Sequence, residues 1–461
     1  MRTTHLDDVT SNQRRRMRPR TALLSTAFLF TALVTAVPTT AAMANTANPA
    51  TTSDNPAVIA EWNAIAVSTL ASDPTKKPQE TFLYTGFVQA AVYDAVVGIR
   101  GRYEPYSFNG HPGRHASATA AAVAAAHKIL VTYAPNATAA LDASYAASLA
   151  AIPAGSAKTR GIDFGTRSAD HLIAMRVNDG RNGPALFTAA PAPGVWRPTP
   201  PANLAMFVPW MGSVTPLLVR SAAQFDPGPP PAMSSAQYAR DFNEVKSLGA
   251  STGSARTAEQ TATALFFSGN AAVQFNAAMT DLIGARHLGI VDTARMYAAV
   301  DMSMADAVIS VWYTKLKYGF WRPITAINLA DTDPNPDTQA TPAWTPLLTT
   351  PPYPEYVSGY SGVVGAFARA LTETLGTRHV DVTLISTAVP GVTRHYDALA
   401  AVGVVVDARV WLGIHFRFAD TRGAAIGQRV ADYALDHFLK PKDGERSARS
   451  QSGSEHGGSG D

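Results

Sequence analysis

Two cations and a proline lie close together in the C-terminal half of the chain. The segment 311–323 reads VWYTKLKYGFWRP, with Lys315 and Arg322 seven positions apart and Pro323 directly after them. Seven positions are nearly two helical turns, so the two side chains are expected to face the same way. Alone, such a pair usually forms a solvated basic face. Followed by a helix-breaking proline, it is also arranged to hold an anion.

A second candidate element is the segment 354–362, which reads PEYVSGYSG. It precedes an amphipathic pattern that runs to Gly376, so Ser358 and Gly359 are expected at a helix N-terminus. Backbone N–H groups and the positive end of the helix dipole favour an anion there. An ordinary N-cap turn would have the same sequence pattern.

A third cation and a histidine lie in the segment 408–417, ARVWLGIHFR. Arg409 and His415 are six positions apart, which is about 120° around an ideal helix. A straight helix would not direct both side chains to one point. Gly413 is placed to break the helix between them. Without the other two segments, this histidine would be interpreted as a core residue.

Together the three segments resemble the superfamily of type 2 phosphatidic acid phosphatases and vanadium-dependent haloperoxidases. The family pattern is Lys-x6-Arg-Pro, then Pro-Ser-Gly-His, then Ser-Arg-x5-His, and the first motif is complete here. Three further segments, 89–95, 241–246 and 354–356, extend the resemblance to the exported bacterial haloperoxidase-like branch.

The resemblance implies that a cationic cradle binds vanadate, or phosphate in the same place. It assigns the oxyanion to three cations, a hydroxyl and a backbone N–H: Lys315, Arg322, Arg409, Ser358 and Gly359. It makes His415 catalytic, either as the axial ligand of vanadium or as the nucleophile that attacks phosphorus.

The chain departs from the family pattern at several positions. Tyr360 takes the place of the acid–base histidine, and a phenol with a pKa near 10 is a poor proton shuttle at neutral pH. Val357 and Ala408 replace the proline and serine of the motifs. Asp420 lies one position later than the acidic residue that often orients the last family histidine. His395 is a candidate replacement for the missing acid–base, although a structural role is favoured.

Three functions follow from this reading. The first is an exported enzyme that binds vanadate and oxidises halide with hydrogen peroxide. The second is a soluble acid phosphatase that hydrolyses phosphate esters through a phosphohistidine. The third is an oxyanion-binding homologue with impaired catalysis, because the acid–base position is Tyr360. The expected partners are small molecules in every case, and the sequence does not indicate an oligomeric state.

The N-terminus has the pattern of a secretory signal peptide. A basic segment, 14–20, precedes an apolar segment, 21–37, and Ala42-Met43-Ala44 fits a cleavage site, so cleavage after about Ala44 and secretion are expected. Six arginines and two aspartates precede residue 45, so the formal charge of +3 becomes about −1 without them, and no nucleic-acid partner is expected. Beyond residue 44, no apolar run approaches the roughly 18 residues of a membrane span. The absence of cysteine excludes thiol chemistry and cysteine-ligated metal sites.

The rest of the sequence predicts an all-α fold of two packed helical bundles joined by a proline-rich irregular segment. The predicted organisation is an N-terminal helical region (45–180), a proline-rich wrap (181–233), a C-terminal helical domain with the oxyanion site (234–440) and a disordered tail (441–461). Helical patterns occupy 57–72, 79–98, 115–134, 137–151, 156–177, 234–248, 256–268, 272–286, 290–318, 360–375, 397–413 and 421–439.

Overall fold

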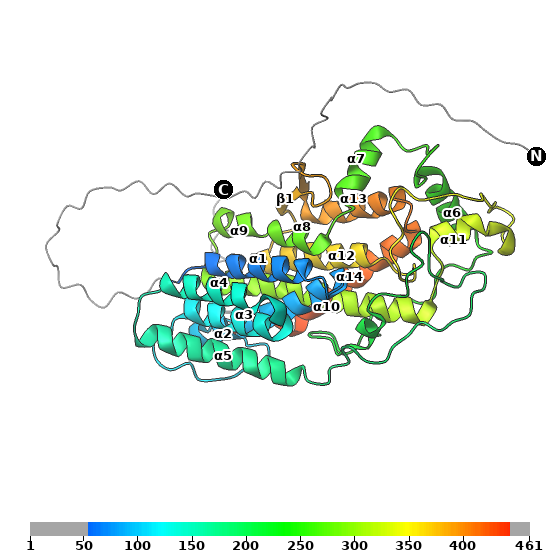
Figure 1. Ribbon diagram of the computed structural model, residues 1–461. Helices are drawn as coiled ribbons and strands as arrows, with labels where there is room; N and C mark the ends of the chain where they lie inside the picture. Colours follow the sequence, from blue (N-terminus) through cyan, green and yellow to red (C-terminus); the bar gives the residue numbers. More distant parts are fainter. Residues whose placement is uncertain (1–53, 443–461) are drawn as a thin grey trace, which may run out of the picture. The chain divides into compact units, whose positions relative to one another are not determined.

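Helices carry nearly all the regular structure of residues 54–442, the part of the chain that this computed structural model describes (Figure 1). The α-helices are α1 (Ala57–Ser72), α2 (Pro78–Arg100), α3 (Ala118–Tyr133), α4 (Thr138–Ala150), α5 (Ser156–Met175), α6 (Ala236–Leu248), α7 (Ala258–Phe266), α8 (Ala271–Ala277), α9 (Thr280–Ala285), α10 (Ile290–Tyr318), α11 (Pro323–Asn328), α12 (Gly359–Leu375), α13 (Ala398–Trp411) and α14 (Arg417–His437). Short 3-10 helices are η1 (Pro135–Ala137), η2 (Pro209–Ser213) and η3 (Ala330–Thr332). The all-α prediction is confirmed.

The sequence patterns missed three local features. The predicted helix 272–286 is two helices, α8 and α9, because the backbone tightens to i→i−3 bonds at Met279 and Leu282. An antiparallel hairpin joins β1 (Asp381–Ile385) to β2 (Thr393–Asp397), and strands this short give little periodic signal. Helix α11 begins at Pro323, so this proline opens a helix at the position where its missing N–H costs nothing.

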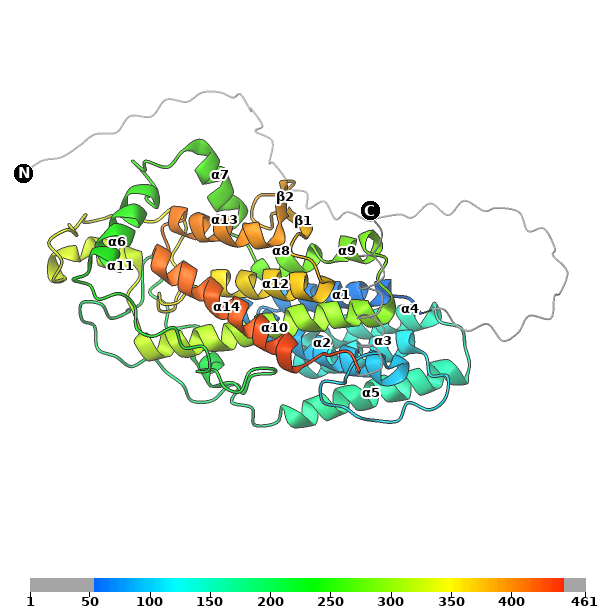
Figure 2. The same ribbon diagram turned by 180° about the vertical axis from the view of Figure 1, so that it is seen from behind.

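Helix α10 is the central element of the bundle. It packs against α2 on one side and against α12 and α14 on the other, as both views show (Figures 1 and 2). Helices α2, α3 and α5 pack against one another next to it. Helix α2 is long and apolar enough to span a membrane by length and composition, but 89% of its most apolar window is buried, as in the core helix of a folded domain.

The predicted signal peptide, residues 1–44, lies outside the described residues, and so does the predicted tail from residue 443. The tail prediction is wrong at its first two residues. Pro441 pairs with Tyr103 in an isolated bridge, and the Lys442 N–H donates to the Arg102 carbonyl at 3.0 Å.

Small residues let α12 and α14 approach closely. A Cβ at Gly427 would lie 1.9 Å from the Gly362 carbonyl oxygen, and one at Gly365 would lie 2.3 Å from that of Ala424. The helices are equally close at Gly423, where an added Cβ would lie 2.4 Å from the Ser358 carbonyl oxygen. The spacing of these two helices therefore fixes where the N-terminus of α12 lies.

Replacing Gly427 with alanine should lower the free energy of unfolding by about 1–3 kcal/mol, since the added methyl must push two backbones apart. Gly403→Ala is the matched control, because Gly403 is exposed in α13 and a Cβ there meets nothing within 4 Å. The control should gain about 0.5–1 kcal/mol from helix propensity. Urea unfolding of both variants measures this, and equal stabilities would contradict the close contact.

A buried carboxylate on α10 contributes to holding the proline-rich segment in place. Asp306 accepts the backbone N–H groups of Leu217, Leu218 and Val219 at 2.6, 2.7 and 2.9 Å. Burial nevertheless raises the pKa of Asp306 to about 6. The folded state therefore binds a proton more tightly than the unfolded chain, so this group lowers stability as the pH rises from about 4 to about 6.

Asp306→Asn should cost about 1–3 kcal/mol at pH 7, because one amide oxygen cannot satisfy three N–H groups. The difference from wild type should be larger at pH 4, where only the wild type gains from the tightly bound proton. Urea unfolding at the two pH values measures it. A smaller difference at pH 4 would mean that the three N–H groups dominate and depress the pKa.

Candidate functional site

Lys315 and Arg322 meet around one loop, although they do not share a helix face. Lys315 lies in the last turn of α10, and Arg322 is the N-cap of α11 after the chain has turned. The Lys315 Nζ donates to the carbonyls of Pro354 and Glu355 at 2.6 and 3.0 Å. The Arg322 Nε donates to the Tyr353 carbonyl at 2.8 Å. The segment 353–355 thus positions both cations.

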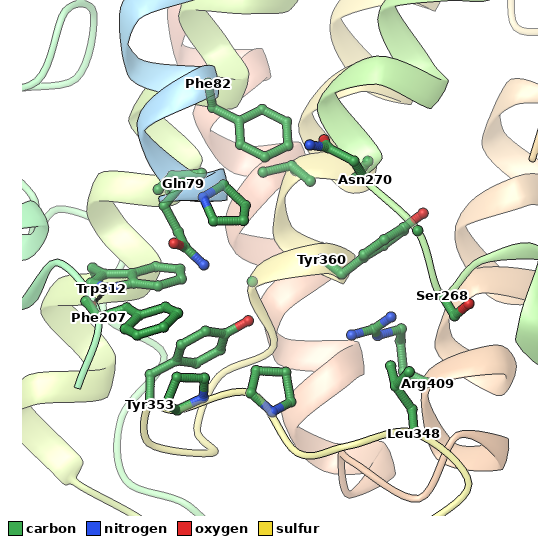
Figure 3. Close-up of a pocket in the computed structure, with 18 residues that line it drawn as sticks. Gln79, Phe82, Phe207, Ser268, Asn270, Trp312, Leu348, Tyr353, Tyr360 and Arg409 are labelled. Atoms are coloured by element: carbon green, nitrogen blue, oxygen red, sulfur yellow. Dashed lines mark hydrogen bonds between the residues drawn. The ribbon is translucent and has the colours of Figure 1, made fainter. Parts of the chain in front are cut away.

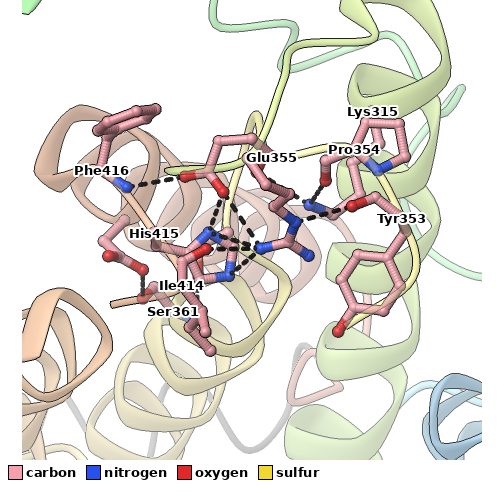
Figure 4. A network of polar contacts seen from close by, with 11 residues as sticks. Lys315, Tyr353, Pro354, Glu355, Ser361, Ile414, His415 and Phe416 are labelled. Carbon is pink, nitrogen blue, oxygen red and sulfur yellow. Dashed lines mark hydrogen bonds and ion pairs between the residues drawn. The ribbon is translucent and has the colours of Figure 1, made fainter. Parts of the chain in front are cut away.

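The Glu355 carboxylate is the centre of this network (Figure 4). Its Oε2 lies 2.9 Å from His415 Nδ1 and 3.1 Å from Arg322 Nη1, and its Oε1 accepts the Phe416 N–H at 2.9 Å. The Arg322 Nη1 also donates to the Ile414 carbonyl at 2.8 Å. Glu355, Arg322 and His415 are almost completely buried.

Burial determines the protonation of this group. It raises the pKa of Glu355 to about 8 and lowers the pKa of His415 well below its ordinary value. The carboxylate contact favours the imidazolium, but burial and three nearby cations outweigh it. We therefore assign a neutral imidazole whose Nδ1–H donates to Glu355, which leaves a lone pair on Nε2, 3.3 Å from Arg322 Nη1. Burial and Arg322 also lower the pKa of Lys315.

Arg409 reaches the same place from α13. The helix ends at Trp411, and Gly413 adopts a positive φ of 76°, so the chain turns before His415 as the sequence predicted. The Arg409 Nη1 donates to the Phe267 carbonyl at 3.1 Å. Its charge contributes to the lowered pKa of both His415 and Lys315.

Two buried guanidinium nitrogens, Arg322 Nη2 and Arg409 Nε, have no hydrogen-bond partner among residues 54–442. A buried, charged donor without an acceptor is costly, so such atoms indicate a missing anionic partner. Tetrahedral oxyanions such as vanadate and phosphate carry several strong acceptor oxygens. The residues present therefore fit an oxyanion of this kind.

The N-terminus of α12 lies where the sequence predicted it. Ser358 is the N-cap, its hydroxyl accepts the Ser361 N–H at 3.4 Å, and Gly359 is the first helical residue. The N–H groups of a first helical turn have no partner in their own helix and attract anions. A peptide bond in the cis form joins Tyr356 to Val357 just before this helix.

Tyr360 presents its ring to the cradle and directs its hydroxyl away. The Arg409 guanidinium lies 4.5 Å from the ring centroid. The hydroxyl donates to Gln274 Oε1 at 2.9 Å, and burial raises its pKa. In this arrangement the phenol proton is donated to Gln274 and does not point at the cradle.

Asp420 and His395 were the candidates for orienting His415 and for replacing the acid–base histidine. Asp420 Oδ1 accepts the Ser361 hydroxyl at 2.8 Å and so ties α14 to α12, and burial raises its pKa to about 7. The carboxylate that contacts His415 is Glu355, for which the sequence predicted no role. His395 is exposed on β2, where its Nδ1 lies 3.1 Å from the Thr383 hydroxyl.

An apolar cavity of about 430 Å³ lies beside the cradle (Figure 3). Tyr353, Gly359, Tyr360 and Arg409 belong both to its lining and to the site. Most of the remaining lining is aromatic or aliphatic, with contributions from α2, α10 and the loops before α8 and α12. The cavity thus joins the C-terminal motifs to the start of the N-terminal bundle.

Above about pH 8, where Glu355 is ionised, Glu355→Gln should lower the free energy of unfolding by about 3–5 kcal/mol, since it leaves Arg322 buried without its counter-charge. Added inorganic phosphate should raise the melting temperature of this variant more than that of wild type, because it supplies the lost negative charge. Asp54→Asn, which breaks the more exposed Arg100 pair, should cost less than about 1 kcal/mol.

Calorimetry of the three proteins, with and without phosphate, measures both effects. A phosphate shift in Glu355→Gln no larger than that in wild type would contradict an anion site next to Arg322.

Known proteins share this sequence pattern and fold. A family model described as the second helical-bundle domain of VCPO matches residues 295–444. The vanadium chloroperoxidase of Curvularia inaequalis is 29% identical over an alignment that covers 32% of each chain. The chain thus spans about a third of the length of the curated relative that it matches.

Solved structures match over more of the chain. A bacterial vanadium-dependent iodoperoxidase superposes with a TM-score of 0.72 and 25% identity, covering 85% of this chain and 100% of that one. The apo form of a bacterial vanadium-dependent chloroperoxidase, with a TM-score of 0.63 and 18% identity, covers 79% of this chain and 94% of that one and shares the fold. This chain belongs to the superfamily of vanadium-dependent haloperoxidases and type 2 phosphatidic acid phosphatases.

Proposed function

We propose that this protein is a vanadate-dependent haloperoxidase, which oxidises a halide with hydrogen peroxide. The observation that carries the proposal is the pair of unpartnered guanidinium nitrogens, Arg322 Nη2 and Arg409 Nε, beside a neutral His415. Relatives named vanadium chloroperoxidase and vanadium-dependent iodoperoxidase support the same reading.

Vanadate would be held by charge-assisted bonds from the three cations, with the first turn of α12 contributing a hydroxyl and a backbone N–H: Lys315, Arg322, Arg409, Ser358 and Gly359. His415 Nε2 would be the candidate ligand of vanadate, since its neutral form keeps a lone pair. When bound, vanadate would supply the centre that activates peroxide for a two-electron oxidation of halide.

The protein residues prepare this chemistry in two ways. Glu355 fixes the tautomer and the ring orientation of His415, so the same nitrogen always faces the cradle. The buried cations are already in place and lose no solvation when negative charge develops, which makes them effective electrostatic stabilisers. Their positions follow from backbone carbonyls and one carboxylate rather than from mobile surface contacts.

A specific observation favours a second candidate, an oxyanion-binding homologue with impaired turnover. Peroxide reduction needs protons, and the Tyr360 hydroxyl is donated to Gln274 rather than into the cradle. General acid–base catalysis typically contributes about 10²–10⁴ in rate. A phosphatase reaction at the same cradle would suffer the same loss, because its leaving group also requires a proton.

The proposal predicts bromide oxidation that depends on both peroxide and vanadate. His415→Ala should lower the rate at least about 100-fold, since it removes the candidate ligand. His395→Ala is the matched histidine control and should retain the wild-type rate. Hydrolysis of p-nitrophenyl phosphate, inhibited by vanadate, without halide oxidation would replace the proposal with the phosphatase. Binding of vanadate without either activity would favour the impaired homologue.

Tyr360→His should raise the rate of bromide oxidation by about 10²–10⁴, because it restores a group that can exchange protons at neutral pH. The gain should appear in kcat more than in KM for peroxide, as expected for a proton-transfer step. Tyr433→His is the matched control, because the Tyr433 hydroxyl is bonded by Arg220 outside the cradle, and it should keep the wild-type rate. An equal or smaller rate in Tyr360→His would mean that protons already reach the cradle by another route.

A further inference from the structure

Four buried polar side chains lie together in the core, away from the oxyanion cradle. Each belongs to a different helix: Asn63 to α1, Gln89 to α2, Asn276 to α8 and Asp301 to α10. Helix α1 packs against the other three, and α2 packs against α8 and α10. Asp301 precedes Lys315 by 14 positions in α10, which is about 21 Å along the helix. The cluster is therefore separate from the site of the proposed function.

The three amides of this cluster form a chain of hydrogen bonds. The Gln89 Nε2 donates to Asn63 Oδ1 at 2.8 Å, and the Asn63 Nδ2 donates to Asn276 Oδ1 at 2.7 Å. The Asn276 Nδ2 donates to the Ala272 carbonyl at 3.0 Å. Each amide nitrogen thus has an acceptor. The Gln89 Oε1, at the end of the chain, is buried and has no hydrogen-bond partner among residues 54–442.

Asp301 adds two more acceptors without a partner. The residue is 1% exposed, and neither carboxylate oxygen has a hydrogen-bond partner in the described part of the chain. Burial raises the pKa of Asp301 well above its usual range, although the Asn276 amide acts in the opposite direction. Buried charges are normally paired with an opposite charge or with a metal ion. The cluster therefore offers open acceptors, one group of them charged, to an occupant that carries positive charge.

Helix α2 approaches α10 closely at Asp301. A Cβ at Gly86 would lie 3.2 Å from the Asp301 backbone carbonyl oxygen and 2.9 Å from the Ala305 Cβ, so only a residue without a side chain fits there. Thr85 precedes Gln89 by four positions and so shares its helix face. The Thr85 hydroxyl is also buried without a partner in the described residues. Helix α2 thus supplies two neutral oxygens on the face that carries Gln89.

We propose that this cluster binds one monovalent metal cation, sodium or potassium, through the Asp301 carboxylate and the Gln89 amide oxygen. Hard cations prefer carboxylate and carbonyl oxygens as ligands. One carboxylate balances a single positive charge, whereas a divalent ion would leave an uncompensated charge in the core. A water molecule would donate to the same oxygens but leave the negative charge unbalanced. This inference goes beyond the proposed function and does not rest on it.

The dependence of stability on the cation tests this site. The melting temperature of the wild type is measured at pH 8 in sodium, potassium and tetramethylammonium chloride at one ionic strength. Sodium or potassium should raise it above the value in tetramethylammonium, an ion too large for the packed core. Above the dissociation constant, each tenfold rise in the metal cation should increase the ratio of folded to unfolded protein about tenfold. Magnesium at the same ionic strength should give no such rise.

Asp301→Asn should abolish the difference between the metal cations and tetramethylammonium, with the fold checked by circular dichroism. Asp306→Asn is the matched control and should keep the full response, because this carboxylate on the same helix already accepts three backbone N–H groups. Gln89→Leu removes a neutral ligand and should weaken the apparent affinity at least about 10-fold. It provides the test if Asp301→Asn does not fold.

Equal melting temperatures in all three salts would overturn the proposal and mean that Asp301 is buried with a proton. A full response in Asp301→Asn or in Gln89→Leu would assign the ion to another place and overturn it as well. A rise with magnesium that Asp301→Asn removes would contradict the assignment of a single charge. Vanadate and peroxide are absent throughout, so failure of the haloperoxidase proposal would leave these outcomes unchanged.

Discussion

One buried carboxylate holds the site together. Glu355 contacts Arg322 and His415 through its side chain and Lys315 through its backbone carbonyl, so a single residue fixes two cations and the histidine. A buried charge is tolerated only when it is paired and hydrogen-bonded, and here each member of the group satisfies another. The cradle has more cations than carboxylates, which leaves it prepared for an anion rather than neutralised internally.

The packing of the helices determines where the cations, the carboxylate and the histidine of the site lie. Close contact between α12 and α14, through Gly365 and Gly427, fixes the position of the N-cap Ser358 along the axis of α14. Asp420 then joins the two helices near that N-cap. Because Lys315 ends α10 and Arg409 ends α13, four helix termini converge on one small volume. Helix termini are where unpaired backbone groups remain, so such a volume is intrinsically polar.

The sequence predicts the helices and the motif residues well, because periodicity and spacing are local properties. Gly413 between Arg409 and His415 correctly indicated that the helix must break. The role of Glu355 could not be read in this way, since its partners lie 33 and 60 residues away along the chain. The signal that existed was an acidic residue between a proline and a tyrosine, directly before the second motif.

The pairing of residues near 103 with residues near 441 constrains how the chain can fold. The Glu104 N–H donates to the Lys440 carbonyl at 2.8 Å, and Arg295 donates to the Leu439 carbonyl at 2.8 Å. The first contact joins segments more than 300 residues apart and the second joins segments 144 residues apart. Contacts between such distant segments form slowly, because closing a long loop costs conformational entropy. The N-terminal helices therefore complete their packing only after the last helix has been synthesised. The protein must consequently spend its synthesis with part of its apolar surface uncovered.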